Sequence, residues 1–275
     1  MQFEIERIIR TALAEDIGLG DVTSAVTVTP DAVARAELVA REDFTLAGLD
    51  VAAAVFAALD SEVRFEKLFV DGQTVQRGEV IAWLKGKASI LLQGERVALN
   101  LLQRMSGIAS LTAQYVAEVK GTKAKIVDTR KTVPGLRALD KYSVRMGGGW
   151  NHRIGLFDGV LIKENHIVAA GGISAAIVRA KEQIPHTLKI EIETRDLVEV
   201  EEALQAGADI IMLDNMSLEE MSQGVELIAG RALVEASGGV NLERVRGIAE
   251  TGVNIISVGA LTHSVSAADI SMLFN

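Results

Sequence analysis

The stretch KIEIETRDLVEVEEALQAGADIIMLDN, residues 189–215, decides the fold. It starts with alternating charged and apolar residues at the strand candidate Lys189–Ile192 and ends with a short apolar run at Ile210–Leu213. Between them, Glu199–Ala206 has helical character and is followed at once by Gly207, a typical helix stop signal. Short apolar runs bounded by polar loops are typical of buried strands. The stretch therefore predicts a strand, helix and strand of a parallel sheet.

The same pattern recurs through the second half of the chain. A Ser217-x-x-Glu220 capping box and Asn241 before Leu242–Glu250 mark further helix starts. Six units spaced by about 20 to 35 residues predict an α/β fold with a barrel-like parallel sheet. An open doubly wound sheet is the competing topology, because a standard barrel has eight units. The remaining strand candidates are Lys125–Asp128, Gly159–Ile162, Leu233–Glu235 and Ile255–Val258.

The chain up to Ser106 mixes helices and strands, which is typical of an α+β arrangement. A long amphipathic helix is expected at Gly94–Lys120. Other expected elements are helices at Met1–Gly18 and Asp50–Leu59 and extended segments at Ala36–Ala40, Val63–Val70 and Val80–Leu84.

Residues Asp71–Val80 combine two glycine turns with short strands, a pattern that also occurs in swinging-arm carrier domains. Those domains present a modifiable lysine at a hairpin tip, and this stretch contains no lysine. We therefore interpret it as a plain hairpin of the scaffold.

The composition limits the possible functions. With 275 residues and 49% hydrophobic content, the chain can bury a large core in one large or two modest domains. A net charge of −9 without any Lys/Arg-rich tract argues against nucleic-acid and membrane surfaces as partners. No apolar run approaches the roughly 18 to 20 residues of a membrane span. The absence of cysteine excludes a thiolate nucleophile and is compatible with the cytoplasm.

Polar or glycine residues follow every predicted strand of the second half. The carboxyl ends of strands in a parallel barrel meet at one rim, where active sites lie. Loop polarity would explain any one of these residues, but not their sorting by charge along the chain. Basic residues follow the first two strands, acidic residues the next two and glycines the last two: Arg130, Lys131 and Lys163; Glu193 and Asp214; Gly238, Gly239 and Gly259.

This sorting indicates a ligand with several anionic groups. Arginine can bind carboxylates and phosphates through two hydrogen bonds, and glycine turns expose backbone N–H groups to phosphates. Glu193 and Asp214 are too few for a calcium cage, but they can hold a partly hydrated Mg²⁺ that also binds a pyrophosphate. The residues alone thus predict a phosphoester ligand with Mg²⁺.

A triple glycine, Gly147–Gly149, precedes His152 and Arg153. Three consecutive glycines cost folding entropy, so we expect the backbone there to pack closely against a neighbour. His152 and Arg153 are then candidate anion ligands. We interpret His166 as a hydrogen-bonding residue near the site, because the four histidines lack the spacing of a metal site.

Seven segments together resemble the quinolinate phosphoribosyltransferase family. Their joint order and spacing are specific, and the match runs nearly end to end. Glu164 stands where the family commonly has Asp, and the basic and acidic site positions are intact. The matching segments are Ala12–Ser24, Gly94–Asn100, Asp128–Arg137, Gly147–Arg153, Leu161–His166, Met212–Met216 and Glu235–Val240.

The resemblance implies an α/β fold with two domains. These are an N-terminal α/β sandwich at residues 1–106, rejoined by the segment 264–275, and a C-terminal, incompletely closed α/β barrel at 107–263. It also implies a cytoplasmic homodimer whose active sites span two subunits, and it leaves a higher oligomer open. The implied enzyme is a pentosyltransferase of NAD biosynthesis with Mg²⁺ as cofactor. It transfers phosphoribosyl from 5-phosphoribosyl 1-pyrophosphate to quinolinate with decarboxylation, giving nicotinate mononucleotide, pyrophosphate and CO₂.

The resemblance also implies a role for each site residue. Quinolinate would be surrounded by Arg96 of the neighbouring subunit and by Arg130, His152, Arg153 and Lys163. The catalytic residues Lys131, Glu193 and Asp214 would serve the ribose, the pyrophosphate and Mg²⁺, and the two carboxylates either bind the metal directly or act on the ribose. The remaining substrate-binding positions are Thr129 and the phosphate cradle of Ser237, Gly238, Gly239, Val258, Gly259 and Ala260.

Two other functions remain open on the sequence. One is a related phosphoribosyltransferase that acts on nicotinate or another base, including the molybdenum-operon relatives of the family. A monocarboxylate would need fewer basic groups than Arg96, Arg130, Arg153 and Lys163 provide. The other is a non-catalytic phosphate-sensing module, which would not require the pair of Glu193 and Asp214.

Overall fold

The structure, a computed structural model, describes residues 2–275, and the chain divides by its contacts into two compact units. The first unit runs to Ala113 and adds Thr132–Gly148 and Thr262–Asn275, and the second contains Gln114–Lys131 and Gly149–Leu261. These boundaries differ from the predicted 1–106 with 264–275 and 107–263.

A buried ion pair explains why Thr132–Gly148 belongs to the first unit. Asp140 is fully buried, and its two carboxylate oxygens accept hydrogen bonds from the Arg104 guanidinium at 3.0 and 2.8 Å. Such paired contacts are strong and fix geometry. The segment is thereby held against the long helix of the first unit.

The first unit is built around an antiparallel sheet with the strand order β12-β1-β5-β3. The C-terminal strand pairs with β1, from Ala36 opposite Phe274 to Ala40 opposite Ile270. The elements of this unit are α1 (Gln2–Ile17), α2 (Val22–Thr27), β1 (Val33–Ala40), β2 (Phe44–Thr45), α3 (Leu49–Leu59), β3 (Arg64–Lys67), β4 (Thr74–Val75), β5 (Val80–Lys87), α4 (Ala88–Glu118, up to residue 113), α5 (Arg137–Met146) and β12 (Ile270–Phe274).

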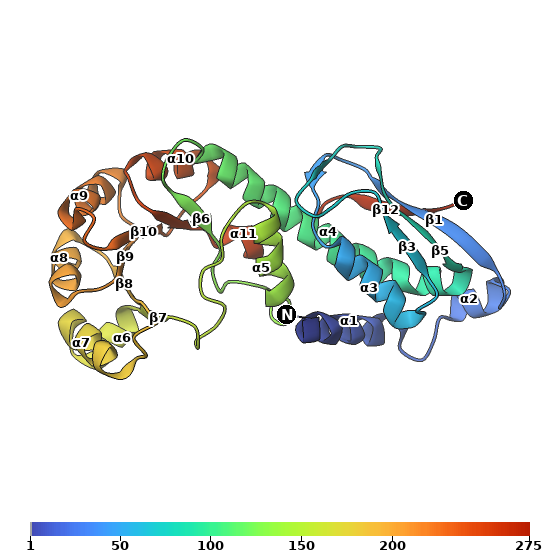
Figure 1. Ribbon diagram of the computed structural model, residues 1–275, viewed down its shortest axis with the longest axis horizontal. Helices are drawn as coiled ribbons and strands as arrows, with labels where there is room; N and C mark the ends of the chain where they lie inside the picture. Colours follow the sequence, from blue (N-terminus) through green and yellow to red (C-terminus); the bar gives the residue numbers. More distant parts are fainter. Residues whose placement is uncertain (1) are drawn as a thin grey trace. The chain divides into compact units, whose positions relative to one another are not determined.

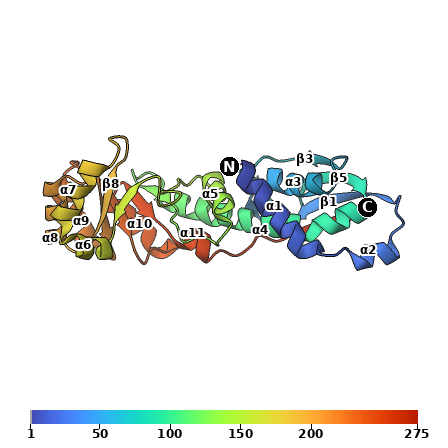
Figure 2. The same ribbon diagram turned by 90° about the horizontal axis from the view of Figure 1, so that it is seen from below.

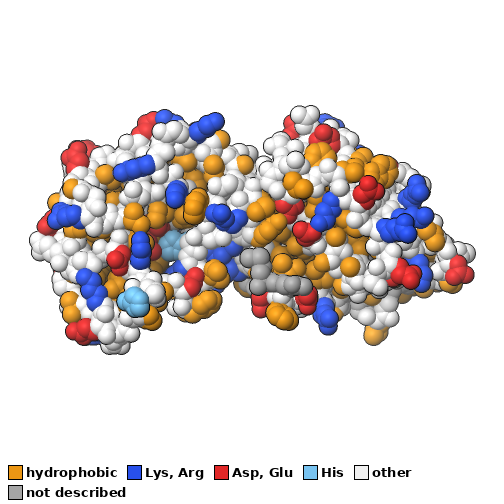
Figure 3. All heavy atoms as spheres, viewed as in Figure 1, with side chains coloured by type: hydrophobic (Ala, Val, Ile, Leu, Met, Phe, Trp, Pro, Cys, Tyr) orange, Lys and Arg blue, Asp and Glu red, His pale blue; other side chains and the backbone are white. Residues whose placement is uncertain are grey.

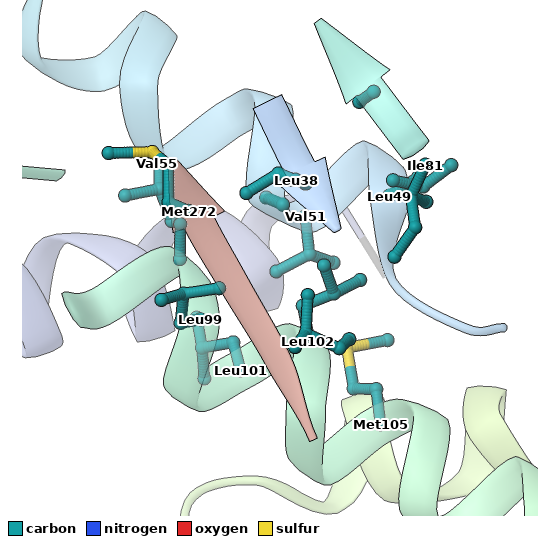
Figure 4. Packing of buried hydrophobic residues seen from close by; sticks show 14 of the residues in the cluster. Leu38, Leu49, Val51, Val55, Ile81, Leu99, Leu101, Leu102, Met105 and Met272 are labelled. Atoms are coloured by element: carbon teal, nitrogen blue, oxygen red, sulfur yellow. The ribbon is translucent and has the colours of Figure 1, made fainter. Parts of the chain in front are cut away.

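Helices α3 and α4 supply the core of this unit together with the sheet. Figure 4 shows Val51 and Val55 of α3, Leu102 of α4 and the strand residues Leu38 and Met272 among the packed side chains. Full burial of one such aliphatic side chain stabilises the fold by about 1.5 to 3 kcal/mol. The apolar face predicted for the long helix is therefore a core face.

Helix α4 begins at Ala88 and not at the predicted Gly94. Glycine is a poor helix former, so the sequence favoured a start at this residue. In the structure Gly94 lies inside the helix, where an added Cβ would be 2.7 Å from the Phe56 ring. Close packing, and not a helix end, explains the glycine.

The hairpin predicted within Asp71–Val80 is wrong in its pairing. Strand β4 pairs with β2, with Phe44 opposite Val75, while β5 pairs with β1 and β3. Because β5 already has a neighbour on each side, it offers no free edge to β4. Gly72 and Gly78 have left-handed φ angles of 91° each, as the two turns require.

The second unit repeats strand and helix in regular alternation. Its elements are β6 (Lys125–Val127), β7 (Val160–Ile162), α6 (Glu164–Ala170), α7 (Ile173–Gln183), β8 (Ile190–Thr194), α8 (Leu197–Ala206), β9 (Ile210–Asp214), α9 (Leu218–Ile228), β10 (Leu233–Ser237), α10 (Leu242–Glu250) and β11 (Ile255–Ser257). The short helix α11 (Ala260–His263) crosses the boundary between the units.

The strands of the second unit form one parallel sheet with the order β6-β11-β10-β9-β8-β7. Each strand from β7 to β11 is added beside the previous one, and β11 then pairs with β6. A doubly wound sheet would reverse direction at a switch point, so this order confirms a barrel. Within residues 2–275 no pairing joins β6 to β7, which leaves the barrel incompletely closed.

Helices cover the outer face of the curved sheet. Figure 1 shows α6 to α10 outside the strands, and Figure 2 shows α7, α8 and α9 together on one side of β8. Side-chain oxygens start three of these helices: Asp196 accepts a hydrogen bond from Glu199 N, Ser217 from Glu220 N, and Asn241 from Arg244 N. The helix starts predicted at Ser217 and Asn241 are confirmed.

Along each strand, side chains alternate between the helix-covered face and the inside of the barrel. Glu191 and Glu193 share one face of β8, and Glu235 and Ser237 share one face of β10. Among the residues that alternate with these, Ile190, Ile192, Val234 and Ala236 are apolar and buried. The inside of the barrel therefore carries acidic groups at two depths.

No helix within residues 2–275 is long and apolar enough to cross a lipid bilayer.

Candidate active site

The carboxyl ends of the parallel strands bring most of the predicted site residues to one rim of the second unit. The register places Ser237 opposite Asp214 and Thr194 opposite Leu213, so three neighbouring strands end at the same level. Lys163 follows β7 directly. The loops after β6 and β11 carry the others: Thr129, Arg130 and Lys131, and Val258, Gly259 and Ala260. Arg96 is the exception, because it lies exposed on α4 of the first unit.

Lys163 and Glu193 form an ion pair between the ends of β7 and β8. The lysine side chain is half exposed, so the pair is accessible from solvent. The sequence suggested a basic side and an acidic side of the rim, but here the two kinds of group neutralise each other. An anionic ligand that binds Lys163 would compete with Glu193 for the ammonium group. It would either displace the carboxylate or bind beside it.

Asp214 is held by its own turn. Asn215 has a left-handed φ of 58°, its Nδ2 donates to Asp214 Oδ2 at 3.0 Å, and its backbone N–H donates to Ser237 O at 2.9 Å. A Cβ added at Gly238 would lie 2.2 Å from Asn215 Oδ1. Glycine is required at 238 because the turns after β9 and β10 pack against each other.

The glycine turn after β10 has the backbone shape of an anion cradle. Gly238 and Gly239 have left-handed φ angles of 89° and 58°, and α10 starts directly behind them at the Asn241 cap. Consecutive turn amides and a helix N-terminus both favour a phosphate group.

Residues 149–159 form a loop that is tied to β6. The backbone N–H of Trp150 donates to Ile126 O at 2.8 Å, and the buried Asp128 carboxylate accepts from Asn151 Nδ2 at 2.6 Å and from His152 N at 2.9 Å. These bonds set the starting position of His152 and Arg153. The sequence analysis gave Asp128 no role, although an acidic residue at a strand end was a visible signal.

Arg153 directs an incompletely satisfied guanidinium into the barrel. Its Nη1 donates to Gly159 O at 3.2 Å, while its buried Nε has no hydrogen-bond partner in the part of the chain that the structure describes. Burial and repulsion from nearby Arg130 lower the pKa of Arg153, although Glu191 and two other carboxylates oppose this. The two neighbouring guanidinium groups, with the buried Nε of Arg153 still available, are suited to a dianionic ligand.

His152 faces two carboxylates. Its Nε2 lies 3.1 Å from Glu191 Oε2 and 3.6 Å from Glu235 Oε2, and both glutamates are buried. The sequence analysis assigned no role to Glu191 or Glu235. The signal was present, because each is a charged residue within a segment predicted as a buried strand. Whether His152 also contacts a substrate anion stays a prediction.

Protons are shared within this cluster. Burial opposes a charge on His152, but the two glutamates outweigh it and raise the pKa of the imidazole to about 10. Burial and the neighbouring Glu235 raise the pKa of Glu191 to about 7, against the effect of His152. Because both pKa values are raised, the cluster binds one proton more at neutral pH than it would with a neutral imidazole and two ionised glutamates.

The position of that proton follows from a hydrogen bond. The backbone N–H of Arg153 donates to His152 Nδ1 at 2.9 Å, which requires a lone pair on this nitrogen. An imidazolium, which the raised pKa of His152 would favour, has no such lone pair. The hydrogen bond therefore places the additional proton on Glu191, whose pKa is raised, and leaves a neutral imidazole protonated at Nε2.

A cavity of about 560 Å³ extends from this cluster toward the amino ends of the strands. Its lining includes His152, Arg153, Glu191 and Glu235, together with Ile210 from the start of β9. Figure 3 shows a hollow in this face of the second unit in which histidine, basic and acidic side chains come together.

Two further predictions concern local contacts. His166 Nδ1 accepts a hydrogen bond from Lys163 N at 3.0 Å, which confirms its hydrogen-bonding role beside the site. The close packing expected at the triple glycine is also confirmed. A Cβ added at Gly147 would lie 2.3 Å from Ala109 O and 2.6 Å from Thr112 Cβ.

Comparisons with known proteins agree on one family. Residues 21–106 match the family described as quinolinate phosphoribosyl transferase, N-terminal domain, and residues 108–273 match its C-terminal domain. The two matches together cover most of the chain.

Individual relatives support the same assignment. The chain is 44% identical, over 98% of its length and 93% of the relative's, to the probable nicotinate-nucleotide pyrophosphorylase (carboxylating) of Bacillus subtilis. It is 43% identical, over 98% of its length and 82% of the relative's, to a quinolinate phosphoribosyltransferase (decarboxylating) of Nicotiana tabacum.

A solved structure gives the corresponding result for the fold. The nicotinate-nucleotide pyrophosphorylase from Francisella tularensis superposes with a TM-score of 0.96 at 41% identity, covering 100% of this chain and 97% of that one. The chain therefore belongs to the quinolinate phosphoribosyltransferase family.

Proposed function

We propose that this chain transfers the phosphoribosyl group of 5-phosphoribosyl 1-pyrophosphate to quinolinate and releases pyrophosphate and CO₂. The product is nicotinate mononucleotide, a precursor of NAD. The observation that carries the proposal is the pair of neighbouring guanidinium groups of Arg130 and Arg153, with the buried Nε of Arg153 lacking a protein partner. A planar dicarboxylate can engage both groups.

Quinolinate binds through its two carboxylates in this proposal. Arg130, Arg153 and Lys163 contact them from the loops after β6 and β7 and from the 149–159 loop, and His152 lies beside Arg153. Arg96 of a second subunit completes the set, which makes the active unit a homodimer. The exposure of Arg96 on α4 is consistent with this role.

The second substrate binds along the opposite part of the rim. The 5-phosphate occupies the cradle of Ser237, Gly238 and Gly239 with Val258, Gly259 and Ala260, and Thr129 and Lys131 contact the substrate from the loop after β6. The positive φ angles of Gly238 and Gly239 and the start of α10 behind them support this placement.

Glu193 and Asp214 suit Mg²⁺ by their chemistry. Both are oxygen donors at the ends of the neighbouring strands β8 and β9, and Mg²⁺ binds through few carboxylates when substrate phosphates and water complete its shell. When bound, Mg²⁺ would neutralise charge on the departing pyrophosphate. The same two carboxylates would also stabilise positive charge on the ribose.

The chain's own groups position the reactants through each bond change. As the bond between the anomeric carbon and pyrophosphate breaks, Glu193 and Asp214 stabilise the positive charge that develops on the ribose. The pyridine nitrogen supplies its lone pair to the anomeric carbon, so no general base is needed. The positively charged ring then accepts the electrons of the bond to the adjacent carboxylate, CO₂ leaves, and the ring carbon takes up a proton.

A substrate comparison in two variants tests this assignment. Arg130→Ala and Arg153→Ala should raise the KM for quinolinate by about 10- to 100-fold, because each removes a charge-assisted bond. The KM for 5-phosphoribosyl 1-pyrophosphate should stay within about twofold. Unchanged quinolinate kinetics in both variants would exclude this placement, and turnover of nicotinate alone would favour a related transferase.

A further inference from the structure

Two acidic side chains inside the barrel have no place in the reaction as described so far. Glu191 of β8 and Glu235 of β10 are 5% and 1% exposed, and they come from strands separated by β9. They meet at one group, the His152 imidazole of the 149–159 loop, at 3.1 and 3.6 Å from its Nε2. The contact therefore joins a loop at the open side of the barrel to two strands of its wall.

The other side of the imidazole is also fixed. Its Nδ1 accepts the backbone N–H of Arg153 at 2.9 Å. The ring is held between the Arg153 backbone on one side and the two glutamates on the other. The hydrogen bond from Arg153 N–H to Nδ1 also fixes the backbone from which the Arg153 guanidinium extends. A shift of the ring would thus move Arg153 as well.

A purely structural role does not explain why glutamates occupy positions 191 and 235. Each glutamate keeps one buried oxygen, Oε1, that has no hydrogen-bond partner among residues 2–275. A buried polar atom without a partner destabilises a fold by about 1 to 3 kcal/mol. On β9, between the two strands, Ile210 lies opposite Glu191 and Met212 lies opposite Glu235, so apolar side chains fit beside both glutamates.

A metal ion is the competing explanation. One ligand atom each of His152, Glu191 and Glu235 lies within 4.8 Å of the others. Metal binding through Nε2 requires a lone pair there, but Nδ1 already uses its lone pair for the Arg153 amide. A neutral imidazole has one lone pair, so Nε2 carries the hydrogen and donates it to Glu191.

We propose that Glu191 and Glu235 are positioning residues, which hold His152 in the tautomer protonated at Nε2 and thereby fix Arg153 for binding of the dicarboxylate. This inference rests on the proposed function. Neither glutamate touches a substrate, and both act through His152.

Kinetics of matched variants test the proposal. Glu191→Ala and Glu235→Ala should raise the KM for quinolinate by about 10- to 100-fold, because small displacements of binding groups have effects of this size. The KM for 5-phosphoribosyl 1-pyrophosphate should stay unchanged. Glu191→Gln should recover part of the loss, since its amide oxygen can still accept the Nε2 hydrogen. Glu226→Gln, which alters an exposed carboxylate of α9, is the control.

A double-mutant cycle shows whether the effect passes through His152. In a His152→Gln background, Glu235→Gln should cause no further change, whereas independent roles would give additive losses. Nitrogen NMR of the ¹⁵N-histidine-labelled enzyme should show a neutral imidazole, protonated at Nε2, that is assigned to His152 by its absence in His152→Gln, because His166 also accepts a hydrogen bond at Nδ1. This His152 signature should be lost in Glu191→Ala and kept in Glu226→Gln.

The outcomes separate this proposal from the proposed function. A wild-type enzyme that does not use quinolinate would refute the function, and the NMR signature would still test the cluster. An active wild type with Glu191→Ala and Glu235→Ala both unchanged would overturn the positioning role. Equal increases in the KM values for quinolinate and 5-phosphoribosyl 1-pyrophosphate would also overturn the positioning role. So would additive losses in the double-mutant cycle, or a stoichiometric metal in the wild type that is lost in Glu235→Gln.

Discussion

At the scale of single residues, Arg153 offers the sharpest prediction. Arg153→Lys keeps the charge but removes the planar group with its buried Nε. We expect the KM for quinolinate to rise by about tenfold or more, with little change for 5-phosphoribosyl 1-pyrophosphate. Initial rates with each substrate varied in turn measure this, and Arg179→Lys on the exposed face of α7 is the control. Equal effects on both substrates would contradict the role of Arg153.

Tyr142 provides a pH dependence in the first unit. Its hydroxyl donates to Asp71 Oδ2 at 2.7 Å, and Asp71 also accepts the backbone N–H groups of Gly48 and Leu49. Burial, and then the bond to Asp71 and its charge, raise the pKa of Tyr142. Because the folded-state pKa is the higher one, this stabilisation is complete below the ordinary value of about 10 and is lost as pH rises above it.

The comparison with Tyr142→Phe tests that sign. The variant should lower the free energy of unfolding by about 1 to 2 kcal/mol near neutral pH. The difference from the wild type should shrink at pH values above about 10. Urea unfolding followed by circular dichroism at several pH values measures it, and a difference that does not depend on pH would show that the hydroxyl has no such linkage.

The residue scale is also where the sequence was least informative. Lys163 was identified from its position after a predicted strand and Arg153 from its position after the triple glycine. The ion pair of Lys163 with Glu193 was not predicted, because it depends on which strands are neighbours. Glu191 and Glu235 were passed over for a related reason. Their shared partner His152 comes from a loop whose path the sequence did not define.

At the scale of elements, the capping box of α9 can be tested in isolation. Ser217 Oγ accepts the Glu220 N–H at 3.2 Å, and Glu220 Oε2 accepts the Ser217 N–H at 2.8 Å. Ser217→Ala should lower the free energy of unfolding by about 1 kcal/mol. Chemical denaturation measures the change against Gln223→Ala, an exposed position in the same helix. A loss no larger than in this control would show that the cap is unimportant.

The packing of α5 against α4 depends on the lack of a side chain at Gly147. Gly147→Ala places a Cβ 2.3 Å from the backbone oxygen of Ala109, which cannot move independently of its helix. Overpacking of this kind costs about 1 to 3 kcal/mol. We expect a lower thermal midpoint, with Gly159→Ala as the comparison, because Gly159 has no left-handed φ and an added Cβ there would come no closer than 3.7 Å to a neighbouring atom. Equal midpoints for the two variants would contradict the packing argument.

Elements were predictable where local signals agreed. The six barrel strands lie within one or two residues of their predicted positions, because apolar runs, caps and glycine stops mark them independently. The start of α4 was misplaced because Gly94 serves packing and not termination. The pairing of β4 with β2 was missed because strand partners distant in sequence leave no local signal.

At the scale of the whole molecule, the proposed dimer makes a prediction about mixed subunits. Arg96→Ala and Lys163→Ala should each lose most activity, the first through the partner's site and the second through its own. Unfolding and refolding the two variants together should restore activity, because some mixed dimers contain one site with both residues intact. Refolding each alone is the control. Activity that is not restored by mixing would place Arg96 in the site of its own subunit or outside the reaction.

The central claim concerns the reaction, and the most direct measurement offers the enzyme two acceptors. Purified protein with Mg²⁺ and 5-phosphoribosyl 1-pyrophosphate receives either quinolinate or nicotinate, and nicotinate mononucleotide and CO₂ are quantified. We predict equimolar nicotinate mononucleotide and CO₂ from quinolinate and no product from nicotinate. Product from nicotinate alone, or from neither acceptor, would contradict the account.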